Sequence, residues 1–465
     1  MYRIFLTAIA VTMTVTAQPI PDFTPPTPLF RAVLGNDEAE VKRLLDSGVN
    51  PNDGRFIGGA PALILSLMQQ RPNIAKMLLD KGADVNATDA AGATALMWAA
   101  TSEVADTSLV KELLSRGVDP NAASKSGDTA LSWAMRRGYT PVVEMLKQHG
   151  ASNRAIVRDS VERALTLLEK SSPEFIKVSG CVSCHNQSIP QMAVAIAKTR
   201  GIRTDSAMWD KQAKAVVAFF KPLREPFMTG KSGIPDPAIT IPYFLLGLNA
   251  AGHKPDGTTE AMAHMVSTQQ RPDGSFTYIG ARPPMESSPV SATALSVRAI
   301  QLFGENRNEL IEKAREYLRT VKTSTTEEHT MKLLGLMWTN ADPSDIKSAA
   351  DVLIAQQRPD GGWSQLPTLE TDAYATGQAL YALMESNAIQ TAGKEYQKGV
   401  AYLLRTQRPD GSWLVRSRSV PFQPYKESGF PHGKDQWISA AGTGWSAMAL
   451  AMGLPVEQQI TQLDE

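Results

Sequence analysis

Short amphipathic segments recur through the first third of the chain with a nearly constant period. They end in pairs of large apolar residues with glycine three positions further on, as in Leu44-Leu45-x-x-Gly48. The four glycines, at positions 48, 82, 117 and 150, are 34, 35 and 33 residues apart. Such a period predicts pairs of short helices that bury their apolar faces only by stacking on neighbouring pairs. Each glycine is expected to end the second helix of its pair in the left-handed conformation.

Longer amphipathic segments follow from about residue 186, and three of them end in nearly the same turn. The turns are Gln270-Arg-Pro-Asp-Gly-Ser-Phe276, Gln357-Arg-Pro-Asp-Gly-Gly-Trp363 and Gln407-Arg-Pro-Asp-Gly-Ser-Trp413. Proline presets φ in such a turn, and glycine takes the positive φ that follows. Together with the 28–152 repeats, this pattern predicts an all-α chain. Twelve helices, enough for six hairpins, are expected near residues 188–200, 209–221, 239–251, 258–268, 288–303, 308–321, 327–339, 344–356, 371–386, 393–406, 438–452 and 455–463.

The period of the first third, with Gly-Ala-Asp-Val-Asn-Ala at 82–87 and Thr94-Ala-Leu-Met-Trp-Ala99, resembles the ankyrin repeat. Four copies cover residues 28–152. The resemblance implies that Thr94 and Thr129 cap the first helix of their repeats. It also implies protein contact through the concave face of the array. The alternative that the repeats only pack on the next domain and shield it stays open, because so few repeats are present.

The repeated turn resembles the QW motif of the squalene-hopene cyclase and protein prenyltransferase superfamily. This resemblance implies that the Gln and the aromatic residue tie helix ends together in an α/α toroid of about six hairpins. We assign the toroid to residues 236–465, with its hairpins starting from about residue 186. The acidic residues Asp273, Asp360 and Asp410 recur with the turns, so we expect them to stabilise the turns and not to catalyse a reaction.

The chemistry of these families is not reproduced in the sequence. Glu370 and Asp372 do not form the Asp-rich acid of the cyclases, and aromatic residues make up only 7% of the chain. A cyclase stabilises its carbocations on aromatic faces. The prenyltransferase zinc ligands and the Cys-Gly-Glu-Gln of thioester domains are absent as well. Whether the chain is an enzyme is therefore left uncertain.

Length and charge restrict the class of protein further. A chain of 465 residues is too long for one core, so two or three domains are expected. Lys plus Arg and Asp plus Glu both number 47, so no long-range field favours nucleic acid or an anionic membrane as a partner.

The first 17 residues have the features of a secretory signal. Arg3 precedes an apolar run from Ile4 to Val15, and small residues end the segment at Ala17. Cleavage is expected before Gln18, with a Pro-rich linker over residues 18–27. We therefore expect a periplasmic or secreted protein with no membrane span after cleavage, the minority alternative being an uncleaved anchor.

The only two cysteines lie in Cys181-Val-Ser-Cys184-His185, which reads C-x-x-C-H. In an exported chain, this spacing favours covalent haem c, with thioether bonds from Cys181 and Cys184 and iron ligation by His185. Residues 153–235 would form the haem-attachment segment and the lead-in to the toroid. Alternatives are a disulfide, half of a zinc site without a partner motif, and a thioredoxin-type pair without its βαβ context.

Two residues are the main candidates for the second axial ligand of the haem iron. We favour His264, on the helix that enters the first repeat turn, over Met228 in a loop framed by Pro and Gly. Three further histidines are weaker candidates, namely His253, His329 and His432.

These observations give three hypotheses for function. The first is a periplasmic c-type haem protein for electron transfer or haem-based redox sensing, with a redox partner protein and an apolar small molecule as candidate partners. The second is a toroid lyase, isomerase or cyclase acting on a lipid or sugar, with a structural Cys181–Cys184 disulfide. The third is a protein-binding scaffold.

Overall fold

The computed structural model describes residues 27–101, 107–138, 140–280, 282–305, 307–420 and 425–457. The predicted signal peptide, nearly all of the Pro-rich linker and most of the predicted helix near 455–463 lie outside these residues. Within the described residues the fold is all helical, as predicted, and β structure is limited to isolated bridges.

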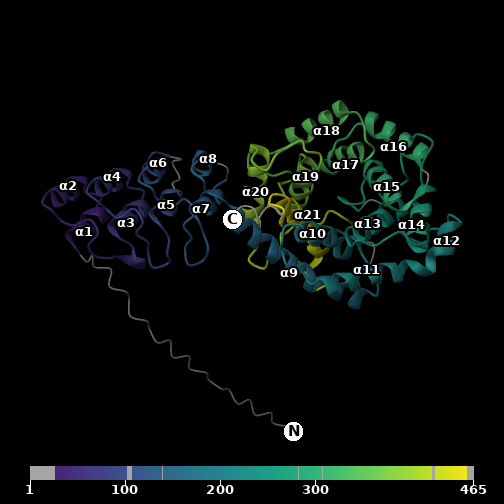
Figure 1. Cartoon of the computed structure of the whole chain (residues 1–465), viewed down its shortest axis with the longest axis horizontal. Helices are drawn as coiled ribbons and strands as arrows, with labels where there is room; N and C mark the ends of the chain where they lie inside the picture. The colour runs from purple at the N-terminus through teal and green to yellow at the C-terminus, as the bar shows by residue number, and fades with distance from the viewer. Residues whose placement is uncertain are drawn as a thin grey trace, which may run out of the picture.

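The N-terminal part is an array of four stacked helix pairs, drawn in purple and blue in Figure 1. Its helices are α1 (Pro28–Leu34), α2 (Glu38–Asp46), α3 (Ala62–Met68), α4 (Pro72–Asp80), α5 (Ala95–Ala99), α6 (Ser108–Ser115), α7 (Ala130–Met135) and α8 (Pro141–Gln148). A short 3-10 turn, η1 (Ile57–Gly59), lies between the first and second pairs.

The predicted helix ends of the array are confirmed. The hydroxyl of Thr94 accepts a hydrogen bond from the Met97 amide, and that of Thr129 accepts one from the Ser132 amide, both at 3.2 Å. The four glycines that follow the second helices all take the left-handed conformation: φ is +90° at Gly48, +84° at Gly82, +83° at Gly117 and +85° at Gly150. Glycine is favoured there because a Cβ would strain this conformation.

The rest of the chain forms a ring of helices around a buried core. Six inner helices pack each on the next, and the last of them, α21, packs back on the first, α10. Figure 1 shows the other long helices following one another around the outside of this set. The inner helices are α10 (Ile189–Lys198), α13 (Pro237–Ala250), α15 (Pro289–Phe303), α17 (Thr326–Trp338), α19 (Ala373–Glu385) and α21 (Gln436–Met452).

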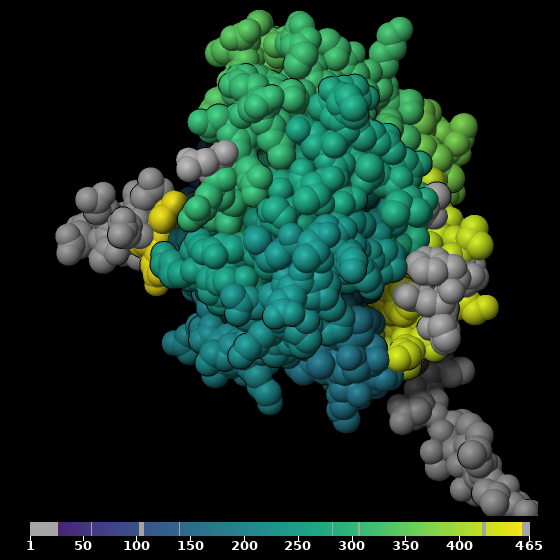
Figure 2. Space-filling model, turned by 90° about the vertical axis from the view of Figure 1, so that its right-hand side faces the viewer, coloured from purple at the N-terminus to yellow at the C-terminus, as the bar shows by residue number. Residues whose placement is uncertain are grey.

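The outer helices alternate with the inner ones along the chain. Figure 2 looks onto the end of the ring farthest from the array, where the teal outer helices form the wall. The outer elements are α9 (Arg154–Ser179), α11 (Ser206–Phe220) with η3 (Lys221–Leu223) and α12 (Arg224–Met228), α14 (Gly257–Ser267), α16 (Asn308–Thr320), α18 (Pro343–Ala355) and α20 (Lys394–Thr406). Since each outer helix returns the chain, the inner helices all run in the same direction.

The ring begins at α9, earlier than residue 186, where we placed its first hairpin. This 26-residue helix packs on α21 and α10 and is the first outer helix of the ring, where we expected no helix before residue 188. The amide of Gln407, in the third repeated turn, donates to the Ser160 carbonyl of α9 at 2.8 Å. The sequence pattern missed this role because α9 is not followed by the repeated turn that marks the other hairpins.

Each repeated turn fastens three helices together. The Gln407 amide joins its own turn to α9, while the Trp413 ring nitrogen donates to the Leu403 carbonyl of α20 at 2.8 Å. The Trp413 amide donates to Thr443 of the inner helix α21 at 3.2 Å. The same Gln contact joins the first turn to the Leu310 carbonyl of α16 and the second to the Glu395 carbonyl of α20.

Glycine is required in these turns by the close approach of the next outer helix. A Cβ on Gly411 would lie 2.5 Å from the Arg163 carbonyl oxygen of α9, and one on Gly274 would lie 2.1 Å from that of Lys313. Both glycines also have positive φ, +89° and +88°. Any side chain here would therefore push two outer helices apart.

The turn aspartates are structural, as expected. The Asp410 carboxylate accepts hydrogen bonds from the amide and the hydroxyl of Ser412 at 3.0 and 2.6 Å, and Asp273 does the same with Ser275. The hydrogen bonds from Ser275 lower the pKa of Asp273 below its ordinary value.

The array contacts the ring through its last repeat. Helix α7 contacts α20, and the Lys147 ammonium of α8 hydrogen bonds to the Gln397 side chain of α20. The last repeat therefore packs beside the position where α20 meets α9.

We predict that the third repeated turn is needed for stability. Trp413→Ala removes a side chain that is 1% exposed and is expected to cost about 3–5 kcal/mol of unfolding free energy. Gln407→Ala removes the contact to α9 and is expected to cost about 1–2 kcal/mol. Urea unfolding followed by circular dichroism measures both, with exposed Gln356→Ala of α18 as the matched control. Unchanged stability in the Gln407 variant would show that this contact does not close the ring.

Candidate functional site

The N-terminal ends of the inner helices meet at one mouth of the ring, and a pocket of about 570 Å³ opens there. We call it the mouth pocket. Its walls come from the segments before α10 and α15, from residues 417–420 and Tyr425, and from the start of α21. The residues that line it are Cys184, His185, Arg282, Pro283, Met285, Glu286, Ser417, Ser419, Val420, Tyr425, Lys434, Asp435, Gln436, Trp437 and Ile438.

Local hydrogen bonds hold the C-x-x-C-H segment at this mouth. Helix α9 ends at Ser179 and is capped by Gly180, which has a φ of +65°. The chain then turns into η2 (Cys184–Ser188), one turn of π-helix before α10. The Ser183 hydroxyl caps η2 by accepting from the Asn186 amide at 3.1 Å. Gln187 ties the turn to α9, since its amide donates to the Ser172 carbonyl at 2.8 Å.

The two cysteines lie in different surroundings and are not joined by a disulfide. Cys181 is exposed, whereas Cys184 is buried in the first turn of η2. Both thiols are free in this structure, and the alternative of a structural Cys181–Cys184 disulfide stays a hypothesis. Burial raises the pKa of the Cys184 thiol to about 12, with the nearby Glu286 charge acting in the same direction. Cys184 is thus a neutral thiol at neutral pH.

His185 is held between two aromatic rings. Its imidazole stacks on Trp437, with ring centres 5.5 Å apart, and meets the Phe175 ring edge to face at 5.8 Å. Nδ1 lies 3.7 Å from the Cys184 sulfur, while Nε2 is buried and has no hydrogen-bond partner among the described residues. Burial, and secondly the charge of Arg282, lower the pKa of His185 to about 3. The imidazole is therefore neutral, with a buried nitrogen that is available to a ligand.

The rest of the pocket combines charged residues with apolar walls. Arg282 pairs with Glu286, and burial raises the pKa of Glu286 to about 7. Asp435 is held by Arg416, whose Nη1 lies 2.9 Å from its carboxylate. Pro283, Met285, Val420, Trp437 and Ile438 supply apolar surface.

The residues present fit a covalently attached haem. A C-x-x-C-H haem needs two thiols free of a disulfide and a neutral imidazole with one nitrogen unused. Cys184 and His185 line a pocket with a largely apolar lining. Cys181, three residues earlier, is exposed and does not line the pocket. The buried Nε2 without a partner favours a ligand at this position, because buried ring nitrogens in proteins are normally hydrogen bonded. Trp437 Nε1, in the same pocket, is also buried without a partner among the described residues.

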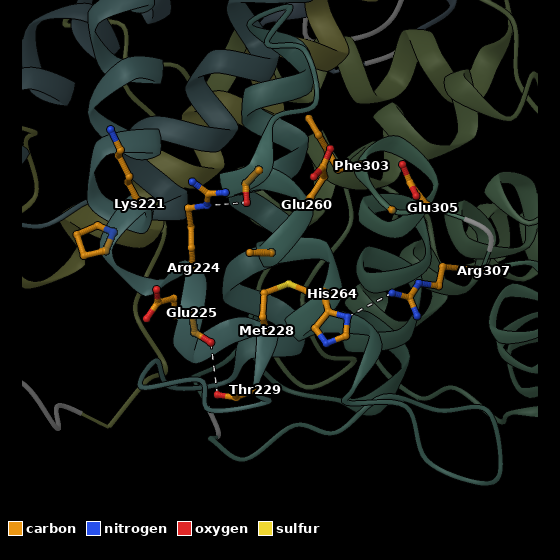
Figure 3. A pocket seen from close by; sticks show the side chains of 14 residues that line it. Lys221, Arg224, Glu225, Met228, Thr229, Glu260, His264, Phe303, Glu305 and Arg307 are labelled. Carbon is orange, nitrogen blue, oxygen red and sulfur yellow. Dashed lines mark hydrogen bonds between the residues drawn. The ribbon is translucent and has the colours of Figure 1, made fainter.

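The two candidates for a second axial ligand lie elsewhere. Met228 and His264 line another pocket, of about 1000 Å³, on the outer wall of the ring between α12 and α14 (Figure 3). His264 Nδ1 lies 3.3 Å from an Arg307 nitrogen, and Met228 is 55% exposed. Neither residue lines the mouth pocket, so the structure brings neither of them to His185.

The weaker histidine candidates also make local hydrogen bonds away from His185. His253 contacts Asp256 at 3.2 Å, His329 contacts Thr323 at 2.7 Å and His432 contacts Ser412 at 2.8 Å. None of the three lines the mouth pocket.

Sequence reasoning missed most of the pocket wall. Arg282, Met285 and Trp437 come from segments about 100 and 250 residues beyond the cysteines, and no spacing rule links them to Cys184. One available signal was position in the hairpin, since 282–286 and 434–438 both directly precede or begin an inner helix.

Comparison with known families identifies the array only. Residues 13–89 and 84–156 match a family model described as ankyrin repeats, in three copies. The N-terminal array thus consists of ankyrin repeats, which generally mediate protein contacts. A search of curated proteins gave no match to the chain.

Clusters of metal-ligating side chains and membrane-spanning helices are both absent from the described residues. Within the described ranges, no group of three or more His, Cys, Asp or Glu side chains is arranged to hold a metal ion. A haem iron would not require such a group, because the porphyrin supplies four ligands. No helix in the described part of the chain combines the length and the apolar character needed to cross a bilayer.

We predict that the two thiols differ strongly in reactivity in the folded chain made without haem. Cys181 is exposed and should react quickly with iodoacetamide, whereas Cys184 should react only on unfolding because it is buried and its thiol is neutral. Peptide mass spectrometry with and without urea measures both. Equal labelling of both thiols in the native protein would contradict the placement of Cys184.

Proposed function

We propose that this protein is an exported c-type haem protein whose haem occupies the mouth pocket of the helical ring. Cys181 and Cys184 would hold the haem and His185 would ligate its iron. The observation that carries the proposal is the buried, unpartnered Nε2 of His185 beside Cys184. When bound, the haem would supply a one-electron redox centre or a gas-binding iron.

The ring itself is proposed to be an α/α toroid like those of squalene-hopene cyclases and prenyltransferases. The closed order of its inner helices and the three turns that each fasten three helices support this relation. The relation concerns fold and carries little information on chemistry.

Met285 is our candidate for the second iron ligand in place of His264 and Met228. It is a thioether that lines the same pocket as His185, and it is only 7% exposed. A thioether together with a histidine is a ligand set that haem iron accepts. Arg282 and Lys434, which line the same pocket, would offer positive charge to haem carboxylates.

The remaining parts would serve recognition and location. The ankyrin array is proposed to bind a redox partner protein through its concave face. The signal-like N-terminus would direct the chain to the periplasm or outside the cell, where haem c is attached. A pure scaffold is the alternative if no haem is attached.

We predict that the chain, matured with the haem c machinery, is heavier than its polypeptide mass by one haem. The Cys181→Ala, Cys184→Ala double variant should lose this added mass and the pyridine haemochrome spectrum. Intact-protein mass spectrometry measures the added mass, and the urea stability of the variant shows whether it still folds. A wild-type chain of plain polypeptide mass after maturation would exclude the haem proposal.

We predict that Met285→Ala changes the iron ligation of the matured protein. The far-red sulfur-to-iron band of the oxidised protein should be present in the wild type and absent in this variant. Met228→Ala and His264→Ala are the matched controls and should leave the band unchanged, because both residues line the outer pocket. If only the Met228→Ala variant lost the band, Met228 and not Met285 would be the second iron ligand.

A further inference from the structure

Exposed apolar side chains surround the opening of the mouth pocket. Val420 is 74% exposed and Tyr425 is 51% exposed, and both line the pocket. Ile279 is 80% exposed and shortly precedes the pocket residue Arg282. Val178, which is 44% exposed, lies in the last turn of α9. We call Val178, Ile279, Val420 and Tyr425 the mouth rim. Apolar side chains exposed in one place and bordered by polar residues are typical of an interaction surface.

Hydrogen bonds hold the segments of the rim in place. The Lys426 ammonium donates to the Ser179 carbonyl at 3.0 Å, which ties the stretch that follows Tyr425 to the end of α9. The Gln436 side chain donates to the Lys426 carbonyl at 3.0 Å and ties the same stretch to α21. On the other side of the pocket, the Ile279 amide donates to the Asp236 carboxylate. The backbone of the rim is thus anchored while its apolar side chains face outward.

The exposed charges beside the rim are mainly positive. Lys426 and Lys434 are exposed, and the Arg416 side chain is 80% exposed. Asp435, which pairs with Arg416, is recessed, with a side-chain exposure of 16%. Glu427 is exposed, and its carboxylate accepts a hydrogen bond from the Tyr425 hydroxyl. A molecule that approaches the opening therefore meets an excess of positive charge, although the chain as a whole is neutral.

This combination fits the acidic surface of another protein. Protein interfaces combine an apolar centre with a polar border, and complementary charges steer the partners together. A membrane surface is usually bound by an amphipathic helix or by a cluster of four or more basic residues. The rim is instead formed mainly by residues outside helices, with a few cations around a hollow. A small interface of this kind is typical of transient complexes between redox proteins.

We propose that the mouth rim docks the acidic surface of a one-electron redox protein, with Lys426 and Lys434 as the charge contacts. This inference rests on the proposed function, because the redox role of the partner requires haem in the mouth pocket. The concave face of the array would hold such a partner nearby. Electrons, however, would pass where the pocket opens, and the rim surrounds that opening.

The docking test uses a labelled synthetic peptide of alternating Glu and Leu residues and the full-length chain made without haem. Control peptides replace every Glu by Lys, or every Leu by Ser. Fluorescence anisotropy should show the first peptide binding about ten-fold more tightly than either control. Raising the salt from about 0.01 M to about 0.15 M should weaken this binding, since the Debye length falls from about 30 to about 8 Å. Equal affinity for the three peptides, or no binding, would overturn the proposal.

Charge variants locate the binding at the rim. The double variant Lys426→Glu, Lys434→Glu should weaken binding of the acidic peptide about ten-fold. The matched control is Lys211→Glu, Lys214→Glu, which makes the same charge change at exposed residues of α11 and should leave binding unchanged. Lys434 is exposed and has no ion pair among the described residues, so Lys434→Glu alone preserves the test if the double variant does not fold. An equal loss in both double variants would contradict docking at the rim.

The apolar part of the rim is tested in the same way. Val420→Ser should weaken binding of the acidic peptide several-fold, whereas Val352→Ser should not change it. Both valines are exposed, at 74% and 42%, so neither change removes a core side chain. Unchanged binding in Val420→Ser would mean that the rim recognises charge alone and would overturn the apolar contact.

Two other occupants of the rim would give different results. Binding to vesicles of phosphatidylcholine and phosphatidylglycerol without binding of the peptide would assign the rim to a membrane, provided that the Lys426→Glu, Lys434→Glu chain lost it. A dimer in sedimentation velocity that the same variant abolished would assign the rim to a second copy of this chain. Either result would overturn the proposal.

The redox role is tested on the matured, reduced protein with the anion hexacyanoferrate(III). One electron leaves the ferrous protein and converts hexacyanoferrate(III) to hexacyanoferrate(II), and no bond or proton changes place. The rate should fall with salt and should be lower in Lys426→Glu, Lys434→Glu, whereas the cation hexaammineruthenium(III) should show neither effect. The same rates with both reagents would overturn electrostatic docking at the opening.

The failure of this inference and that of the haem proposal can be told apart. A chain that carries haem by mass but binds no acidic peptide would contradict the docking surface and leave the haem proposal intact. A chain that binds the peptide but gains no haem on maturation would contradict the redox role of the partner.

Discussion

The hydrogen bond from Gln407 to the Ser160 carbonyl closes a ring whose two ends are separated by almost 250 residues. The first two repeated turns join neighbours in sequence, Gln270 to α16 and Gln357 to α20. The third uses the same chemistry to join the last outer helix to the first. Every inner helix then has a neighbour on both sides, so the ring has no exposed apolar edge. Closing a ring over so long a chain costs conformational entropy. Burial of the aromatic side chain in each repeated turn helps to offset that cost.

Closure also determines where a site can form. Because outer helices return the chain each time, all inner helices start at the same mouth, and segments distant in sequence meet there. Cys184 and His185 precede α10, Glu286 precedes α15, and Trp437 begins α21. The pocket is therefore a property of the closed ring and not of the C-x-x-C-H segment alone. The ankyrin array is attached on α20, beside the closing contact with α9.

Local signals in the sequence predicted most of the helices and the turns. The Pro-Asp-Gly turns, and the array helices that end at a glycine such as Gly48, depend on the φ preferences of single residues. Such preferences can be read directly from a sequence. Helix α9 could not be assigned to the ring because its partner in the ring, Gln407, is far away in sequence. For His264 the helical pattern held the answer: Met262 and Val266, one turn apart on α14, are buried, whereas Glu260 and His264, also one turn apart, line the outer pocket. The residues that share the mouth pocket with His185 depend on closure, which no local pattern encodes.

Burial has the same effect on the two chemically different groups near the mouth, and this explains how one ring can hold both. It disfavours charge, so it lowers the pKa of His185 to about 3 and raises that of Cys184 to about 12. The imidazole consequently keeps a lone pair, and the thiol keeps its proton. A neutral imidazole and a neutral thiol thus lie 3.7 Å apart without forming an ion pair. In an open, hydrated site both groups would return to ordinary pKa values, so the closed packing of α9, α10, α13 and α21 around η2 is what keeps them neutral.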